Sequence, residues 1–315
     1  MRKVLFSMMA LIQMLAVSCQ KQDAAGLGAA DLAQVSLDIE VTRPVTKAGA
    51  AAQMSQADNV DIVYYEVWNS DWSKKLYPKT GLASAPVVDV QGEKRASVEL
   101  TLVKAQDYKL IFWAQDGDVK AYDVSNLKAV KVDYSKIDGN QDCYDAFYAT
   151  YPLVLTPGQT QTVKLTRPFA QLNFATDRMS TDLGPITLGE TQVTVPSLAT
   201  TFNTVKGEGE DLSQTPVTFK ASGVATDELL PAKGKNYTWV TMDYVLMSGT
   251  EQTVTVDAVF NINGMDKPVK HTVASVPLKK NTKTNIVGDL FTDDASLLVV
   301  VNERFNTPDE VVDVQ

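Results

Sequence analysis

Histidine and cysteine are almost absent from this chain of 315 residues, which contains one histidine and two cysteines. His271 follows Pro268 in a strand-like segment, where we expect a surface or half-buried strand residue. No HExxH, CxxC, GxSxG, P-loop or GxGxxG pattern is present. These absences exclude the common zinc sites and several catalytic motifs, so we expect no metal, no cofactor and no enzyme activity. A hydrolase with two facing carboxylates stays an open alternative, because such a pair has no fixed sequence spacing.

Basic clusters are also missing. The chain has 29 Lys and Arg against 38 Asp and Glu, a formal net charge of −9. Phosphate binding depends on Lys and Arg neutralising the nucleic-acid backbone, so we expect no nucleic-acid partner. The same charge balance disfavours binding to a membrane surface by electrostatics.

One apolar run stands at the very start of the chain. Arg2 and Lys3 precede the segment from Val4 to Val17, which is followed by Ser18 and Cys19. A basic start, a short apolar stretch and small residues are typical of a signal peptide, here residues 1–18. The placement of Cys19 resembles a bacterial lipobox, although Ala16 stands where leucine is commonest. We therefore predict an exported chain that is lipidated at Cys19, with an ordinary signal peptide as the alternative.

Residues 19–34 are small, polar and rich in alanine and glycine, which predicts a flexible tether after the lipid. If Cys19 is acylated, Cys143 has no partner for an intramolecular disulfide. We interpret Cys143 as a small buried apolar residue.

From residue 35 onward the pattern is that of β-strands. Val35, Leu37, Ile39 and Val41 alternate with polar residues, the period of a half-buried strand. Further strands are expected at 60–68, 96–103, 108–114, 127–133, 160–166, 169–175, 186–195, 237–247, 252–260, 284–291 and 296–301. Helical periodicity is weak throughout, and only 177–184 and 224–230 could each hold a turn or two of helix.

Turn signals separate these strands. Asn263-Gly264 suits a tight hairpin, because both residues tolerate positive φ. Many short strands with frequent turns predict an all-β fold of antiparallel Greek-key β-sandwiches. We place a domain boundary near Arg167-Pro168, which gives an N-terminal domain at 35–167 and a C-terminal domain at 168–315.

The acidic segment 138–145 only partly resembles an EF-hand calcium loop. Its acids stand at positions 1, 5 and 8, and no glutamate follows at position 12. We interpret it as a solvated loop, with a cation site as the alternative. The aromatic residues Trp113 and Trp239 lie in strand segments and are expected in the core rather than on a binding platform.

Both ends of the chain carry features suited to strand exchange. An uninterrupted apolar segment needs cover on both faces, which favours an interior place in a sheet of its own domain or of another subunit. Such a segment is formed by Leu297, Leu298, Val299, Val300 and Val301. Near the front, the small-residue stretch 43–52 would be open to proteases, and a cut there would separate the strand at 35–41 from the rest.

Several motifs together resemble the Bacteroidales fimbrillins, the subunits of type V pili. The resemblance rests on the lipoprotein signal, on the order and spacing of motifs from about 60 to 290, and on the stretch after the first strand. The motifs are VTRPVTKAG at 41–49, YKLIFWAQ at 108–115, DCYDAFYA at 142–149, RPFAQLNF at 167–174 and LKKNTKTNIVGDLF at 278–291.

The resemblance implies two transthyretin-like β-sandwich domains, an outer-membrane lipoprotein displayed on the cell surface, and a role in a fimbrium and in cell adhesion. It also implies that the first strand, with Val35, Leu37, Ile39 and Val41, is removed by proteolysis. A donor strand from another fimbrial subunit then fills the groove, and Leu297–Val301 with its tail would be the donor of this chain. In the family the cut commonly follows arginine, but Pro44 after Arg43 hinders such a cut, so Lys47-Ala48 is the better position.

Two alternatives remain open from the sequence. The chain could be an uncut anchor or accessory subunit held by its lipid, or a monomeric surface lipoprotein that binds a glycan or another ligand of a host or bacterial surface. The second would need an exposed aromatic platform.

Overall fold

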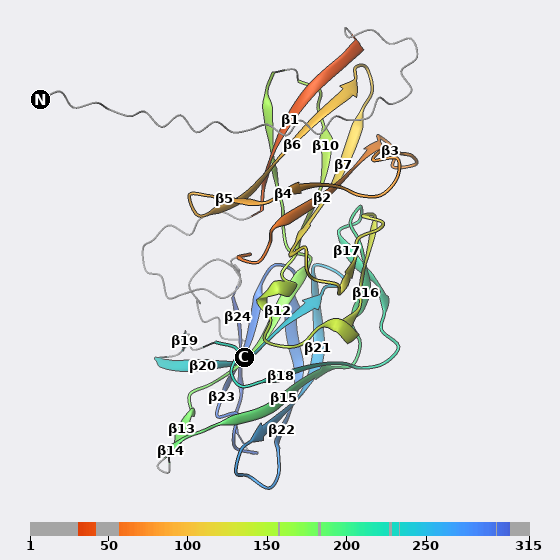
Figure 1. Ribbon diagram of the computed structural model, residues 1–315. Helices are drawn as coiled ribbons and strands as arrows, with labels where there is room; N and C mark the ends of the chain where they lie inside the picture. Colours follow the sequence, from red (N-terminus) through yellow and green to blue (C-terminus); the bar gives the residue numbers. More distant parts are fainter. Residues whose placement is uncertain are drawn as a thin grey trace, which may run out of the picture.

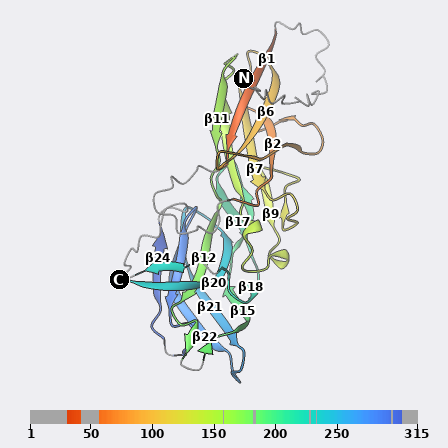
Figure 2. The same cartoon turned by 60° about the vertical axis from the view of Figure 1, so that its left-hand side comes forward.

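The computed structural model describes residues 31–41, 57–156, 158–181, 184–226, 229–232, 234–293 and 295–302, and these residues form an all-β protein. The expected class of antiparallel β-sandwiches is confirmed, with two parallel strand pairs among the antiparallel ones. Within the part of the chain that is described, no helix is long and apolar enough to cross a membrane. Figures 1 and 2 show an elongated molecule with one group of strands at each end.

Two sheets form the upper body in Figure 1. The first has the order β11-β1-β6-β5, and the second has the order β10-β7-β2-β3, with β4 also paired to β2. Their bounds are β1 Leu32–Glu40, β2 Ile62–Asn69, β3 Lys75–Tyr77, β4 Ala83–Pro86, β5 Val88–Val90, β6 Glu93–Val103, β7 Tyr108–Gln115, β10 Phe147–Leu153 and β11 Thr160–Lys164. The inward residues of both sheets form one apolar core, in which Leu37, Val98 and Phe112 are buried.

Two larger sheets form the lower body, with the orders β19-β20-β12-β23-β24 and β18-β15-β21-β22. Their bounds are β12 Phe169–Thr176, β15 Leu188–Val195, β18 Val217–Ser222, β19 Leu229–Ala232, β20 Lys235–Leu246, β21 Glu251–Ile262, β22 Val269–Lys279, β23 Lys283–Gly288 and β24 Leu298–Asn302. Every residue of β12 is buried, because this strand lies between β20 and β23. A turn forms at Asn263-Gly264, where Met265 N–H donates to Ile262 O and Gly264 has a φ of 91°. The expected tight hairpin with both residues at positive φ is wrong, because Asn263 is not at positive φ and the pairing of β21 with β22 ends at Phe260 and Val269.

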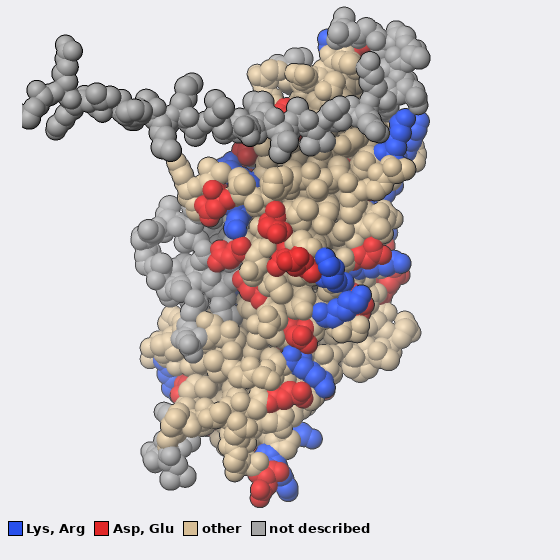
Figure 3. All heavy atoms as spheres, in the orientation of Figure 1, with Lys and Arg blue, Asp and Glu red and all other residues tan. Residues whose placement is uncertain are grey.

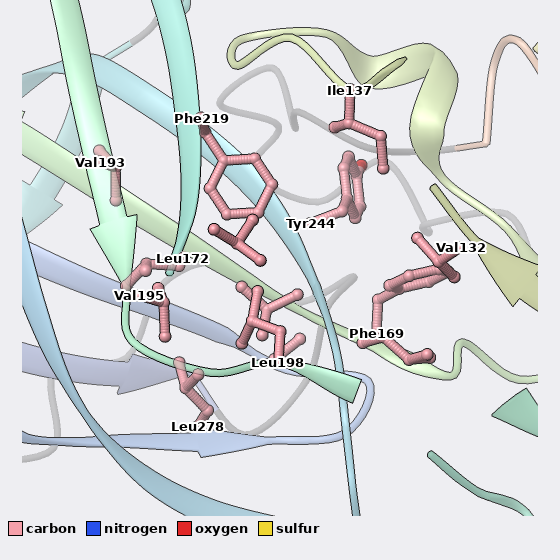
Figure 4. Close-up of a cluster of buried hydrophobic side chains, with 14 of the residues drawn as sticks. Val132, Ile137, Phe169, Leu172, Val193, Val195, Leu198, Phe219, Tyr244 and Leu278 are labelled. Carbon is pink, nitrogen blue, oxygen red and sulfur yellow. The ribbon is translucent and has the colours of Figure 1, made fainter. Parts of the chain in front are cut away.

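A small sheet of order β17-β16-β9-β8 joins the two bodies. Its bounds are β8 Tyr122–Asp123, β9 Ala129–Val132, β16 Ala199–Asn203 and β17 Glu208–Leu212. The core of the lower body therefore continues into residues of the first half of the chain. In Figure 4, Val132 and Ile137 lie against Phe169 and Tyr244. The division at 167 stays a proposal, and backbone pairing of β9 with β16 crosses it.

Three sequence expectations differ from the structure. No helix forms in the described parts of 177–184 and 224–230, which instead contain the short hairpin of β13 (Ser180–Thr181) and β14 (Gly184–Pro185) and the start of β19. The first strand begins at Leu32, three residues inside the expected tether. The only regular helices described are two 3-10 turns, η2 (Tyr134–Lys136) and η3 (Asp142–Tyr144).

Candidate functional site

The first strand occupies an interior place in its sheet. β1 runs antiparallel to β6, with Leu32 to Glu40 in register with Val103 to Arg95, and parallel to β11, with Ser36 to Glu40 in register with Thr160 to Lys164. Its ladder extends past both ends of the strand, since Lys104 N–H donates to Asp31 O and Val41 N–H to Lys94 O. Removal of β1 would therefore leave β6 and β11 each with an unpaired edge.

The inward face of β1 contributes fully buried apolar side chains. Val35, Leu37, Ile39 and Val41 are 1%, 0%, 0% and 3% exposed. Burial of such a side chain stabilises a fold by about 1.5–3 kcal/mol, so the four together contribute about 6–12 kcal/mol before the entropy of ordering the strand is subtracted. A chain without β1 would expose a groove along the same core residues.

The outward face of β1 is polar and paired. Ser36 donates a hydrogen bond to Glu99 Oε2 over 2.8 Å, and Arg95 of β6 is ion-paired with both Asp38 and Glu93. The hydrogen bond to Glu93 raises the pKa of Arg95, and the charges of Asp38 and Glu93 raise it further. This face borders a hollow of about 540 Å³, which is also lined by Val88 and Val90.

The apolar segment at the C-terminal end lies in the sheet of its own body. β24 pairs antiparallel with β23, and among the described strands it is the edge of that sheet. Val300 is fully buried, whereas Leu297, Leu298, Val299 and Val301 are half-buried. The expectation of an interior place in its own domain is therefore wrong, because β24 is paired on one side only among the described residues. The alternative, an interior place in another subunit, stays a prediction.

The acidic segment 138–145 is folded against the lower body. Arg167 donates to both carboxylate oxygens of Asp145 at 2.8–3.0 Å, and both side chains are buried. Burial raises the pKa of Asp145 to about 7, against the opposing effect of the Arg167 charge. Tyr244 donates to Asp142 Oδ1 at 2.6 Å, while Asn140 bonds to main-chain groups of β20. The interpretation as a solvated loop is wrong for Asp145, because these carboxylates satisfy the groups of neighbouring strands.

Metal-ligating side chains do not gather anywhere in the described residues in a group of three or more. The aromatic side chains of Trp113 and Trp239 are 0% and 4% exposed, so their expected place in the core is confirmed. His271 lies in β22 as expected, but the expectation of a surface or half-buried position is wrong, because the side chain is buried and its Nε2 lies 3.0 Å from Leu290 O. Cys143 is half-buried in η3 and forms no disulfide.

Three predicted positions lie outside the described residues: the lipidation site Cys19, the cleavage site Lys47-Ala48, and the tail after β24. The displaced strand and the donor strand are both described, and they lie in different sheets. What sequence reasoning missed is the pairing of Arg95 with Asp38. The signal was present only as an aspartate on the polar face of an alternating strand, and its partner lies 57 residues away.

Charged groups of both signs intermingle on the face seen in Figure 3, with no extended patch of one sign. The fold and site define an elongated β-sandwich protein with an N-terminal strand built into the interior of a sheet.

The profile of the family described as "Family of unknown function (DUF6562)" matches residues 28–315, and the chain belongs to this family. No curated protein matches the sequence. The resemblance to fimbrial proteins is confirmed at the level of fold, because solved structures similar to this chain are fimbrial and cell adhesion proteins of Bacteroidales.

Three such structures illustrate the likeness. A proposed cell adhesion protein from Bacteroides uniformis has a TM-score of 0.50 and 12% identity, and the match covers 86% of this chain and 97% of that one. A fimbrial assembly protein from Parabacteroides distasonis has a TM-score of 0.48 and 9% identity, with coverage of 86% and 98%. The tip fimbrial protein Mfa3 from Porphyromonas gingivalis, with a C-terminal truncation, has a TM-score of 0.46 and 11% identity, with coverage of 85% and 99%. At these identities the likeness concerns the fold.

Proposed function

We propose that this chain is a non-enzymatic fimbrial subunit or accessory protein of the cell surface that acts in cell adhesion and assembles by donor-strand exchange. It is exported by residues 1–18 and held at the outer membrane by a lipid on Cys19. Its partners are other fimbrial subunits, and its adhesion ligand is a molecule of a host or bacterial surface. No cofactor takes part.

The observation that carries the proposal is the interior position of β1. The strand is the first described element of the chain, yet it pairs with β6 and β11, which follow it by more than 50 residues. A strand whose main-chain groups bond on both sides, and whose alternate side chains fill a core, can be replaced by another strand of the same pattern. The small-residue stretch that follows β1 offers a place for the cut, at Lys47-Ala48.

β24 is the proposed donor together with the tail that follows it. As an edge strand it is bonded to β23 alone among the described strands, so its departure breaks one ladder rather than two. The bonds that it loses to β23 are regained in the groove of the neighbouring subunit, where two ladders are available.

The assay is polymer formation by residues 20–315 after a nick at Lys47, followed on denaturing gels without boiling. We expect ladders from the nicked protein and monomers from the uncut protein. Persistent monomers after complete nicking and release of the fragment that contains β1 would refute strand exchange. Replacement of Cys19 by alanine in the full chain should release the protein from membranes, and retention of this variant would contradict the lipid anchor.

A reversible lock tests the role of β24 directly. Val287 and Leu298 are partners in the register of β23 and β24, so cysteines at both positions should form a disulfide that holds the donor in its own sheet. In a Cys143→Ser background, the oxidised lock should stop polymer formation and reduction should restore it. Equal polymer formation in both redox states would exclude β24 as the donor. The single variant Leu298→Cys is the matched control.

A further inference from the structure

The apolar pattern of β1 does not by itself fix where a strand sits in the groove. A shift by one residue moves all inward side chains to the outer face and is excluded by burial. A shift by two residues keeps Val35, Leu37, Ile39 and Val41 facing inward. Some other feature of the groove must therefore distinguish registers that differ by two residues.

The polar face of β6 provides that distinction. In the observed register Ser36 is opposite Glu99, Asp38 is opposite Ser97, and Glu40 is opposite Arg95. Arg95 reaches diagonally to Asp38, so it lies between two acids of β1. Acids therefore meet the arginine, and the uncharged Ser36 meets the glutamate through its 2.8 Å hydrogen bond.

Both two-residue shifts bring like charges together. One shift places Asp38 opposite Glu99, and like charges directly opposite each other destabilise a strand pair. The other shift places Glu40 opposite Glu93 but also places Asp38 opposite Arg95, which is an attractive pair. The charges of β6 thus penalise the first shift, whereas the second is disfavoured by the Glu40–Glu93 pair and by loss of the Ser36–Glu99 hydrogen bond, against the Asp38–Arg95 attraction.

We propose that Arg95 and Glu99 select the strand that fills this groove: it must carry an acid in the place of Asp38 and an uncharged residue in the place of Ser36. The inference rests on the proposed strand exchange and adds its specificity. The occupant is a donor strand of a neighbouring subunit with alternating apolar residues and that outward acid. Arg95 lines the 540 Å³ hollow and Glu99 is exposed, so the charges of an incoming strand can meet both from solvent.

The two candidate segments of this chain differ in this respect. Leu297–Val301 contains no charged residue, whereas Val312-Asp313-Val314 has the same apolar, aspartate, apolar order as Leu37-Asp38-Ile39. With Asp313 in the place of Asp38, Val311 meets Glu99 and Gln315 meets Arg95. The match begins at Val311, because Glu310 would fall in the buried place of Val35. In this alignment β24 falls outside the groove, so the charge selection favours the tail of a second copy over β24 as the inserted segment, and the oxidised Val287–Leu298 lock would then leave polymer formation intact.

The first experiment uses the uncut chain and measures hydrogen exchange of the β1 amides. Asp38→Lys and Arg95→Glu should each raise the exchange rate about fivefold, because Arg95 and Asp38 are partly exposed and such pairs are modest. The double variant should recover most of the wild-type protection. Thr101→Lys, on the same face of β6 and opposite Gln34, is the control for a charge change that leaves Arg95 and Glu99 intact.

The second experiment measures the rate of polymer formation by nicked protein. Asp313→Lys and Arg95→Glu should each slow it about fivefold or more, and their combination should restore it. Polymers that form at equal rates in all variants would overturn the charge selection and leave strand exchange standing. If nicked wild-type protein forms no polymers, strand exchange is overturned, and the selection of a donor is overturned with it. This holds even if the double variant of the uncut chain recovers its protection from hydrogen exchange. If each single variant slows polymer formation and the double variant does not restore the rate, the charge selection is also overturned.

Discussion

The substitution Leu37→Ala in the middle of β1 offers a quantitative test of how much this strand contributes to the upper body. Leu37 is 0% exposed and is paired to β6 and β11 on either side. Loss of its three terminal carbons removes about 2.4 kcal/mol of transfer free energy at about 0.8 kcal/mol each. The cavity adds to this, which gives an expected loss of about 2–5 kcal/mol.

The assay is urea unfolding of the uncut chain, followed by hydrogen exchange that is resolved by segment. The loss should appear in the amides of β1, β6 and β11 and in any separate transition of the upper body. Gln34→Ala, an exposed position of the same strand, should change the unfolding free energy by less than about 0.5 kcal/mol. In nicked protein, Leu37→Ala should accelerate the loss of β1 about 30-fold or more, since about 1.4 kcal/mol corresponds to a factor of ten.

A loss below about 1 kcal/mol with unchanged protection of β6 and β11 would refute this reasoning. It would mean that β1 does not fill the core as described. A loss that appears equally in β12 and β23 would instead mean that the two bodies unfold as one unit, and the value would then belong to the whole chain.

Three further predictions concern the lower body and its junction with the upper body. Asp145→Leu removes the buried carboxylate that pairs with Arg167 and should cost about 3–5 kcal/mol in urea unfolding. Asp145→Leu combined with Arg167→Met should recover much of that loss, and a double variant as unstable as the sum of the two single variants would contradict this. Asp243 is buried, and neither of its carboxylate oxygens forms a hydrogen bond. Burial raises its pKa well above the unfolded value, so the protonated carboxyl is favoured in the folded chain. The resulting stabilisation is present below about pH 4 and is lost as the pH rises toward the folded pKa. Asp243→Asn does not titrate, so its advantage in unfolding free energy should grow above pH 4, and a constant difference up to pH 8 would contradict the assignment. Gly209→Ala places a Cβ 2.6 Å from the main-chain oxygen of Met247 and should cost about 1–3 kcal/mol, unlike Gly249→Ala, where the nearest atom is 3.8 Å away; equal thermal stability of the two variants would contradict it.

The sequence predicts well those strands in which each side chain faces either the core or the solvent. The apolar residues of β1 alternate with polar ones, and the four inward residues expected from that alternation are all buried, together with Ala33 and Glu40. β10 was missed, because FYATYPL contains a proline and has no alternation. The apolar residues of β10 do not alternate because one face of the strand is covered in part by β16, which lies about 50 residues later in the chain.

The candidate site was predictable as a strand but not as a set of contacts. Local sequence reveals which side chains of β1 point inward, since that depends on the period of the strand alone. It does not reveal that Arg95 faces Asp38, because the register between two distant strands is a property of the whole sheet. The same holds for Arg167 and Asp145: each stands in a motif that carries the fimbrillin resemblance, and only the fold brings the two motifs together.

The energetics of β1 constrain how an exchange could proceed. Its four inward side chains contribute about 6–12 kcal/mol before the entropy of ordering the strand is subtracted, and the net stability of a typical domain is about 5–15 kcal/mol. An upper body with an empty groove would therefore lose part of its net stability, and β11 would lose its only strand partner among the described residues. A productive exchange must let the donor enter while β1 leaves, pairing by pairing along β6. Glu99 lies in the middle of that path and Arg95 at its end, so a strand that brings an acid opposite Glu99 would meet repulsion before the groove had closed around it.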